Sequence, residues 1–276
     1  MKKTENNYLI TKIIFKKKEI LLTYSFNHEE KTISLDPSVY SDFYLYEGKE
    51  ISKKELQELQ KKNASATTLL LACQLIAKKE YSVFLMKEKL KEKGIKDSLI
   101  QDVIQTLLEQ NLINDQRYAE ELYEVLNARN YGKNYIIRKL HDCGIDTNII
   151  TSFSFEQENE IEKMQTLLPT LLRKYDKENN QIKKDKIYRE YLKYGFDNEN
   201  IQYIISTISL SSESEEMRKC IKEYEKISGH YEKKYCGYEY KKRIIQTLMR
   251  KGFSYDIIKQ VMERINDGTN EPNEMD

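Results

Sequence analysis

The sequence predicts a mainly α-helical protein of tandem three-helix repeats, preceded by a small antiparallel β meander with a short helix. Two observations predict this fold. The chain of 276 residues is 33% charged and contains only 9 Gly and 3 Pro, which favours helices over a many-turned barrel or sandwich. A pattern of one glycine and five apolar positions also recurs four times after the first quarter of the chain. We therefore expect about four helix-turn-helix-like repeats in an elongated, curved array.

The β-rich segment occupies residues 1–63. Tyr8 to Phe15 and Ile20 to Phe26 are rich in β-branched and aromatic residues, and Lys31 to Leu35 forms a third short run. Polar turn signals separate the three runs, which predicts an antiparallel meander. Asp36-Pro37 marks the exit from the last strand.

A short helix follows the meander. Ser52 has the character of an N-cap, and Glu55 stands three residues later, where it completes a capping box. Leu56 and Leu59 then begin an apolar face. We expect Asn63 to end this helix and the repeats to start at residue 64.

Four glycines mark the repeats, at spacings of 50, 51 and 57 residues: Gly94, Gly144, Gly195 and Gly252. Apolar residues stand eight and four positions before each glycine, one helical turn apart, and we expect them in the core. The glycine takes the left-handed conformation that ends this second helix. The residue directly after it, and those six and nine positions past it, should face the same core. In repeat order these residues are Met86, Leu90, Ile95, Ile100 and Val103; Ile136, Leu140, Ile145, Ile150 and Phe153; Ile187, Tyr191, Phe196, Ile201 and Ile204; and Ile244, Leu248, Phe253, Ile258 and Val261.

Each repeat also has an amphipathic first helix and a capped third helix. The predicted first helices cover 68–79, 116–129, 158–175 and 215–227. The third helices have Asp or Ser near their start, as an N-cap requires: Asp97, Asp146, Asp197 and Ser254. The repeats then span 64–114, 115–155, 156–210 and 211–265, with polar inserts near 176–181 and 228–236. We expect residues 266–276 to form a disordered tail.

No catalytic, cofactor or metal motif is found in the sequence. It lacks phosphate-binding and dinucleotide-binding glycine fingerprints and the Gly-x-Ser-x-Gly nucleophile motif. The nearest approaches to metal spacing are Cys220, His230 and Cys236, and His141 with Cys143, but neither has a knuckle or paired-histidine pattern. We therefore expect no enzyme activity, no cofactor and no metal. Four scattered cysteines and the absence of a secretory or transmembrane segment predict a cytoplasmic protein.

Charge is segregated within the repeats although the chain as a whole carries only +1. The thirteen residues before each repeat glycine carry +2, +2, +3 and +4, together +11, against −10 for the rest of the chain. The second helices could thus form a basic stripe suited to phosphate or an acidic protein surface. Alternatively, these side chains only solvate the free helix faces. The candidate contact residues are Lys87, Lys91, Lys133, Arg138, Lys139, Lys183, Lys186, Arg189, Lys241 and Arg243.

The segment from Ala66 to Phe155 resembles the RecX regulatory family. The likeness begins at Tyr81-Ser82, continues through Leu90 to Ile95 and through Leu112 to Ala119, and ends with Gly132-Lys133, Ile136 and Lys139 to Ile145. Its most specific part is the Asn-Asp pair at 114–115 followed by Tyr118-Ala119. For that motif alone, an N-cap at Asn114 or Asp115 with Tyr118 in the core is the alternative interpretation. The β-rich segment is also similar to the extension of Gram-positive members.

The resemblance implies a monomeric modulator of the RecA recombinase. It implies binding in the groove of the RecA–single-stranded DNA filament, inhibition of RecA's ATPase and strand exchange, and thus regulation of homologous recombination and DNA repair. Direct DNA binding occurs in some members. One alternative function is a direct nucleic-acid-binding protein of tandem helix-turn-helix-like repeats that needs no RecA. Another is a protein scaffold without a nucleic-acid partner.

Overall fold

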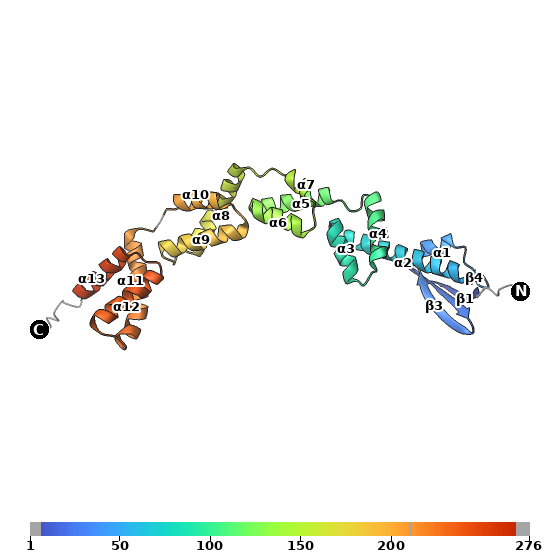
Figure 1. Cartoon of the computed structure of the whole chain (residues 1–276), viewed down its shortest axis with the longest axis horizontal. Helices are drawn as coiled ribbons and strands as arrows, with labels where there is room; N and C mark the ends of the chain where they lie inside the picture. Colours follow the sequence, from blue (N-terminus) through green and yellow to red (C-terminus); the bar gives the residue numbers. More distant parts are fainter. Residues whose placement is uncertain (1–6, 210, 269–276) are drawn as a thin grey trace. The chain divides into compact units, whose positions relative to one another are not determined.

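The computed structural model describes residues 7–209 and 211–268, with side chains described as far as residue 265. It contains four strands and thirteen helices within these ranges: β1 (Asn7–Phe15), β2 (Ile20–Phe26), β3 (Glu29–Leu35), α1 (Pro37–Asp42), β4 (Glu50–Ser52), α2 (Lys53–Ile76), α3 (Val83–Glu92), α4 (Asp97–Glu109), α5 (Asp115–Ala128), α6 (Lys133–Asp142), α7 (Thr147–Thr151), α8 (Gln157–Lys174), α9 (Asn180–Tyr194), α10 (Asn198–Thr207), α11 (Glu213–Glu232), α12 (Gly237–Arg250) and α13 (Tyr255–Gly268). Figure 1 shows the strands at the N-terminal end of the chain and helices throughout the remainder.

The chain consists of two compact units. The first contains Met1–Leu122 and Leu140–Ile150, and the second contains Tyr123–Lys139 and Thr151–Asp276. The division passes through α5 and α6, so the second repeat contributes helix segments to both units.

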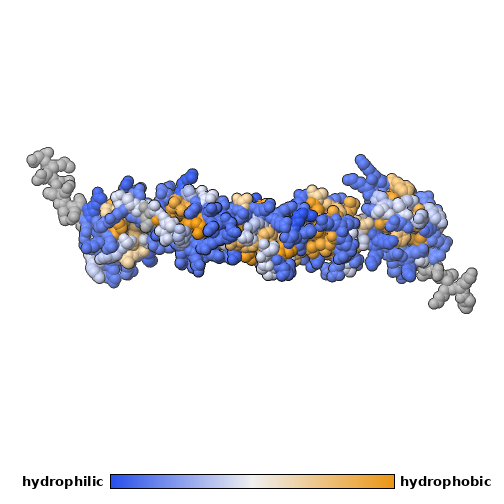
Figure 2. Space-filling model, turned by 90° about the horizontal axis from the view of Figure 1, so that it is seen from above, coloured by the Kyte–Doolittle hydropathy of each residue, from blue (hydrophilic) through white to orange (hydrophobic). Residues whose placement is uncertain are grey.

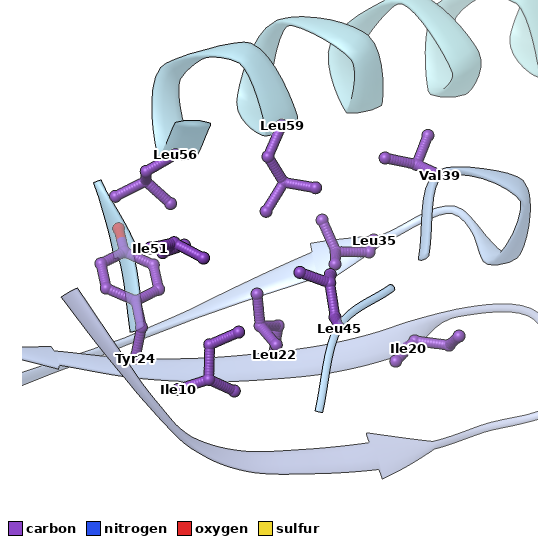
Figure 3. Close-up of a cluster of buried hydrophobic side chains, with 10 residues drawn as sticks. All are labelled: Ile10, Ile20, Leu22, Tyr24, Leu35, Val39, Leu45, Ile51, Leu56 and Leu59. Carbon is purple, nitrogen blue, oxygen red and sulfur yellow. The ribbon is translucent and has the colours of Figure 1, made fainter. Parts of the chain in front are cut away.

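The N-terminal sheet is an antiparallel meander with an added edge strand. Its strand order is β3-β2-β1-β4. Figure 3 shows Ile10 and Leu22 of the sheet facing Leu56 and Leu59 of α2, which cover one side of it. The three predicted strands are confirmed, and the third begins two residues earlier than expected because Glu29 already pairs with Phe26.

Two elements of this segment are not predicted by the sequence pattern. Asp36-Pro37 opens helix α1, because the Asp36 carboxylate accepts a hydrogen bond from the Ser38 amide at 2.9 Å and Pro37 occupies the first turn. Strand β4 has only three residues, too few to show an alternating pattern, and it pairs with the start of β1.

Helix α2 corrects the expected break at residue 63. The capping box of Ser52 and Glu55 begins the helix as predicted, with both reciprocal hydrogen bonds present. The helix then runs without interruption to Ile76. Asn63 does not end it, because its side chain donates to the Ser34 carbonyl and accepts from the Asp36 amide, both at 2.8 Å. One helix therefore belongs to both the sheet core and the first repeat.

The repeat glycines adopt the predicted left-handed conformation. Their φ angles are +77° (Gly94), +73° (Gly144), +87° (Gly195) and +86° (Gly252). At Gly144 the amide donates to the His141 carbonyl at 2.8 Å, and the Ile145 amide donates to the Leu140 carbonyl at 3.1 Å. The same two bonds close the other three second helices. This pattern is a Schellman motif, which satisfies carbonyls that the helix end would leave unpaired.

The predicted core positions are confirmed most sharply in the second helices. All eight residues that stand eight and four positions before the glycines are 0% exposed. The third-helix positions are buried as well, except Phe153, which is half-buried and stacks on Tyr123 with ring centroids 4.6 Å apart.

Three expectations about helix ends are wrong in detail. Asp97 is the first residue of α4, not its cap, and the capping position is Lys96. Helix α11 continues to Glu232, so the expected insert at 228–236 is largely helical. Helix α13 reaches Gly268, within the expected tail, and residues 269–276 lie outside the described residues. No described helix has the length and apolar character needed to cross a membrane.

Candidate partner-binding surface

Successive repeats are joined by the same set of contacts, which lie at the starts and ends of the second helices. The residue that caps each of the first three second helices donates to the carbonyl of the residue before the glycine in the next repeat. In the first unit, the Ser82 hydroxyl donates to the Cys143 carbonyl at 2.6 Å. In the second unit, the Gly132 amide donates to the Tyr194 carbonyl at 2.8 Å, and the Asn179 side chain donates to the Lys251 carbonyl.

A carboxylate on the next repeat's first helix completes each junction. The first amide of α3, at Val83, donates to Asp115 at 2.8 Å. The first amide of α6, at Lys133, donates to Glu160 at 2.8 Å. The corresponding amide of α9, at Asn180, donates to Glu216 at 3.1 Å. We call Asp115, Glu160 and Glu216 the three junction carboxylates. Each carboxylate satisfies an amide that the helix start leaves without a partner, and its negative charge suits the helix dipole.

At two of the repeat glycines the junction leaves no space for a side chain. A Cβ atom on Gly144 would lie 2.3 Å from the Phe84 Cβ, and one on Gly195 would lie 2.3 Å from the Tyr135 amide nitrogen. At Gly94, which starts the series, nothing lies within 4 Å of that position. The second and third repeat glycines thus serve both as helix ends and as points of close approach.

The motif at 114–115 has a role that the sequence alone does not reveal. Asn114 is the N-cap of α5, since its side chain accepts from the Arg117 amide at 3.1 Å. Asp115, the next residue, reaches across to cap α3 of the preceding repeat. The hint available in the sequence was that an acidic residue stands four positions before a small or sulfur-containing core residue in repeats two, three and four.

Burial of Glu160 is the main electrostatic cost of these junctions. Its side chain is 3% exposed, and desolvation raises the pKa of the carboxyl, against the hydrogen bond from Lys133 and the charge of Lys163, which lower it. Its Oε2 atom is buried without a hydrogen-bond partner within the described part of the chain. Lys163 lies 3.9 Å from the carboxylate, and burial lowers the pKa of this lysine.

Most of the predicted basic residues lie on the surface of the second helices. Lys91, Arg138, Arg189, Lys241 and Arg243 are exposed. Lys87, Lys133, Lys139 and Lys186 are half-buried, and Lys186 forms an ion pair with Glu178 at 2.6 Å. Hydrophilic residues cover much of the face seen in Figure 2, with hydrophobic patches between them.

Lys183 is placed differently from the other nine candidates. Its side chain is 7% exposed and lies 3.7 Å from Asp176. A buried lysine of this kind cannot reach a large partner without leaving its site, so we leave Lys183 out of the contact surface.

Tyrosine rings lie beneath several of the basic groups. Tyr131 and Tyr135 stack with ring centroids 4.0 Å apart, and Tyr194 lies 5.4 Å from Tyr131. The Arg138 guanidinium lies 5.2 Å from the Tyr135 ring. In the last repeat, the Arg243 guanidinium lies 5.5 Å from the Tyr235 ring. Such contacts orient the cation while leaving its donors available.

The basic residues all lie on the second helices of their repeats, but they do not all occupy the same position along the helix. Lys133 and Lys241 both stand eleven residues before their glycines, and Arg138 and Arg189 both stand six before theirs. Lys186 and Arg243 both stand nine before theirs, and the other four candidates each occupy a position of their own. At about 100° per residue, the set covers several directions on the solvent side of the helices. The predicted charge therefore marks a basic face of each second helix, broader than a single line.

These features define a class of protein: a tandem three-helix repeat protein whose second helices carry basic side chains, with tyrosine rings beside Arg138 and Arg243. Among the described residues there is no group of three or more His, Cys, Asp or Glu side chains that could hold a metal ion. Exposed ammonium and guanidinium groups suit an anionic partner.

Comparisons with known proteins identify the family. The family model described as "RecX, third three-helix domain" matches residues 214–262, which cover α11 to α13. The chain is 32% identical over 249 residues to "Regulatory protein RecX" of Lactococcus lactis subsp. lactis (strain IL1403), covering 86% of this chain and 90% of that protein. It is 27% identical over 268 residues to the protein of that name from Staphylococcus saprophyticus, covering 95% and 98%. The chain belongs to the RecX regulatory protein family.

A solved structure supports the fold. "Crystal structure of regulatory protein RecX" matches with a TM-score of 0.55 and 20% sequence identity, and the match covers 73% of this chain and all of that chain. At this identity the likeness concerns the fold alone, and it agrees with the helical repeats described above.

Proposed function

We propose that this protein regulates homologous recombination and DNA repair by binding the RecA–single-stranded DNA filament and inhibiting its ATPase and strand exchange. The observation that carries the proposal is family membership, since relatives named regulatory proteins are aligned over most of the chain. It acts by binding and not by catalysis, in keeping with the names of these relatives.

The geometry of the second unit supports an extended, many-point contact. Arg138, Arg189 and Arg243 project from three successive second helices, and all three are exposed. The junctions hold the first turns of α6 and α9 through hydrogen bonds, and the end of α12 accepts one from Asn179, so the three arginines belong to well-fixed elements. A filament presents a repeating surface, and several modest ionic contacts on a repeat protein add up to a stable complex.

The balance of charge supports selectivity for the filament over bare DNA. The second helices carry an excess of positive charge, but the chain as a whole carries only +1. Bare DNA attracts proteins through summed phosphate contacts, which a nearly neutral protein makes only locally. We therefore expect weaker attachment to naked DNA than to the filament.

The first repeat supports a monomeric state. The three junction carboxylates stand four residues before the buried residues Ala119, Met164 and Cys220. In the first repeat, Thr68 occupies the corresponding place before Ala72, and its hydroxyl donates to its own helix at Ala64. Without a carboxylate there, a second copy cannot extend the array by the same contacts.

The test is RecA's ATPase on single-stranded DNA with added protein. We expect inhibition by the native chain. Reversing Arg138, Arg189 and Arg243 to Glu should weaken it about a hundredfold, because three ionic contacts of about 1 kcal/mol each are lost. The matched control reverses Lys96, Arg173 and Lys259, which are exposed but lie outside the second helices.

Three outcomes bear on the proposal. If the native protein leaves the ATPase unchanged and does not sediment with filaments, it does not regulate RecA by this route. If both triple variants inhibit equally, the second helices are not the contact surface. Tight, salt-sensitive binding to naked DNA with no added effect of RecA would favour the alternative of a direct nucleic-acid-binding protein.

A further inference from the structure

We propose that the pocket between the third and fourth repeats, within the second unit, is a second anion site that binds phosphate groups. The pocket has a volume of about 540 Å³. It is lined by the segment before α9, by one face of α11 and by the end of α12. The basic residues of its lining are Lys177, Lys219, Lys222, Lys226 and Lys251.

Three of these lysines form a row on α11. Lys219, Lys222 and Lys226 stand at intervals of three and four residues, which places them on one face of the helix. At 1.5 Å rise per residue the row is about 10 Å long. Lys251 and Lys177 line the same pocket from other segments. The row is long enough to meet more than one phosphate group.

The carboxylates of the pocket are already engaged by lysines. Glu223 accepts from Lys226 and from Lys251, the latter at 2.5 Å, and these hydrogen bonds lower the pKa of its carboxyl. Glu178 pairs with Lys186 at 2.6 Å, and Asp176 lies 3.7 Å from Lys183. The acidic residues of the lining are therefore neutralised within the protein and do not cancel the remaining lysines.

Positive charge remains for a ligand. The lining holds five lysines and three carboxylates. Lys219 is occupied, since it donates to the Glu178 carbonyl at 2.8 Å and to the Ser211 hydroxyl at 3.1 Å. Lys177 and Lys222 are exposed and have no ion pair among the described residues. These two are the ammonium groups that we expect to bind the ligand, because Lys226 and Lys251 are held by Glu223.

The chemistry of the lining favours phosphate. Lysine ammonium groups bind phosphate as point charges, and several of them around one pocket can meet the several oxygens of a phosphate group. The source of the phosphate is either the backbone of a single-stranded nucleic acid or a free polyphosphate. Lys177 and Lys222, the two lysines expected to bind the ligand, come from the loop before α9 and from the first helix of the last repeat, so the site does not use the candidate residues of the second helices and does not depend on the proposed function.

The experiment measures binding of the full chain to a fluorescent single-stranded oligonucleotide over a range of salt concentrations, without RecA. The pocket variant is Lys177→Gln with Lys222→Gln, and the control is Lys233→Gln with Lys234→Gln, which removes the same charge from the end of α11 outside the pocket. Losing two phosphate contacts should lower the slope of log affinity against log salt by about 1.4. Circular dichroism checks that both variants are folded. Direct calorimetry with inorganic tripolyphosphate covers the second source.

Loss of oligonucleotide binding in the pocket variant, beyond the control, supports a backbone-phosphate site. Loss confined to tripolyphosphate supports a site for free polyphosphate. If the pocket and control variants bind both ligands like the native chain, or if the native chain binds neither, the pocket is not a phosphate site. None of these results depends on inhibition of RecA.

Discussion

The double role of the repeat glycines can be measured by comparing Gly195→Ala with Gly94→Ala. Both residues have similar positive φ angles, +87° and +77°. A Cβ on Gly195 would lie 2.3 Å from the Tyr135 amide nitrogen, whereas nothing lies within 4 Å of a Cβ on Gly94. The pair therefore separates the cost of the backbone conformation from the cost of the junction.

The magnitude follows from these contacts. The left-handed conformation costs alanine about 1–2 kcal/mol, which applies to both variants. At Gly195 the clash also displaces Tyr135 and weakens two hydrogen bonds, from the Gly132 amide to Tyr194 and from the Asn134 amide to the Gly195 carbonyl. At about 1 kcal/mol for each bond, with a further overpacking cost, we expect a total loss of about 4 kcal/mol.

The assay combines urea denaturation with amide hydrogen exchange. Denaturation followed by circular dichroism reports the free energy of unfolding, and exchange at the amides of Gly132 and Asn134 reports the junction itself, which is needed because repeats can unfold separately. We expect these two amides to lose protection in Gly195→Ala but not in Gly94→Ala. Equal loss of stability in the two variants, with unchanged protection at both amides, would refute the view that the junction requires glycine.

Three further predictions concern the interior of the second unit. Glu160→Ala should lower the free energy of unfolding by about 2 kcal/mol because it leaves the Lys133 amide unpaired, whereas Glu160→Gln keeps an acceptor for that amide. Because the folded-state pKa of Glu160 is raised, the stability of the native protein should fall as pH rises above the usual range of a carboxyl group. A pH-independent difference in stability between the native and Glu160→Gln proteins in urea denaturation would contradict this. Asn179→Ala should lower stability by about 2 kcal/mol, because it removes the acceptor for the Ile182 amide and the hydrogen bond to the Lys251 carbonyl. Asn179→Ser retains a capping side chain and should cost about half as much. Thermal melts in which the serine variant is no more stable than the alanine variant would exclude the capping role. Burial raises the pKa of the Cys220 thiol to about 12, so a thiol reagent should label exposed Cys236 in the native state and Cys220 only after unfolding; rapid native labelling of Cys220 would contradict its burial.

The repeat pattern shows how far local sequence determines this fold. Every second helix could be located from one glycine and two apolar residues, because a left-handed helix end and a buried stripe each impose a local residue requirement. The helix end expected at Asn63 was wrong because contacts distant in the sequence decide the role of this residue. Asparagine often ends helices, but its side chain here bonds to β3 and to the start of α1, which lie nearly thirty residues earlier in the chain.

The sequence predicted where the basic residues of the candidate surface lie, but not the burial or contacts of each one. Sequence composition located the excess of Lys and Arg on the second helices, and nine of the ten candidates are at least partly exposed. It could not show that Lys183 is buried beside Asp176, or that Arg138 and Arg243 lie against tyrosine rings. The lysine pocket joins lysines up to 74 positions apart, and no periodicity within one repeat indicates such a site.

The sequence by itself determined the class of fold, the glycines that end the second helices, the core residues of those helices and the location of positive charge, because each depends on residues within a turn or two of helix. Only the tertiary structure decided how the repeats join. In the sequence, Glu160 and Glu216 look like ordinary solvated acids and Asp115 looks like a cap of its own helix, yet each of the three caps a helix of the preceding repeat. An unpaired amide at a helix start can donate to any carboxylate that reaches it, and the packing of one repeat on the next decides which carboxylate does so.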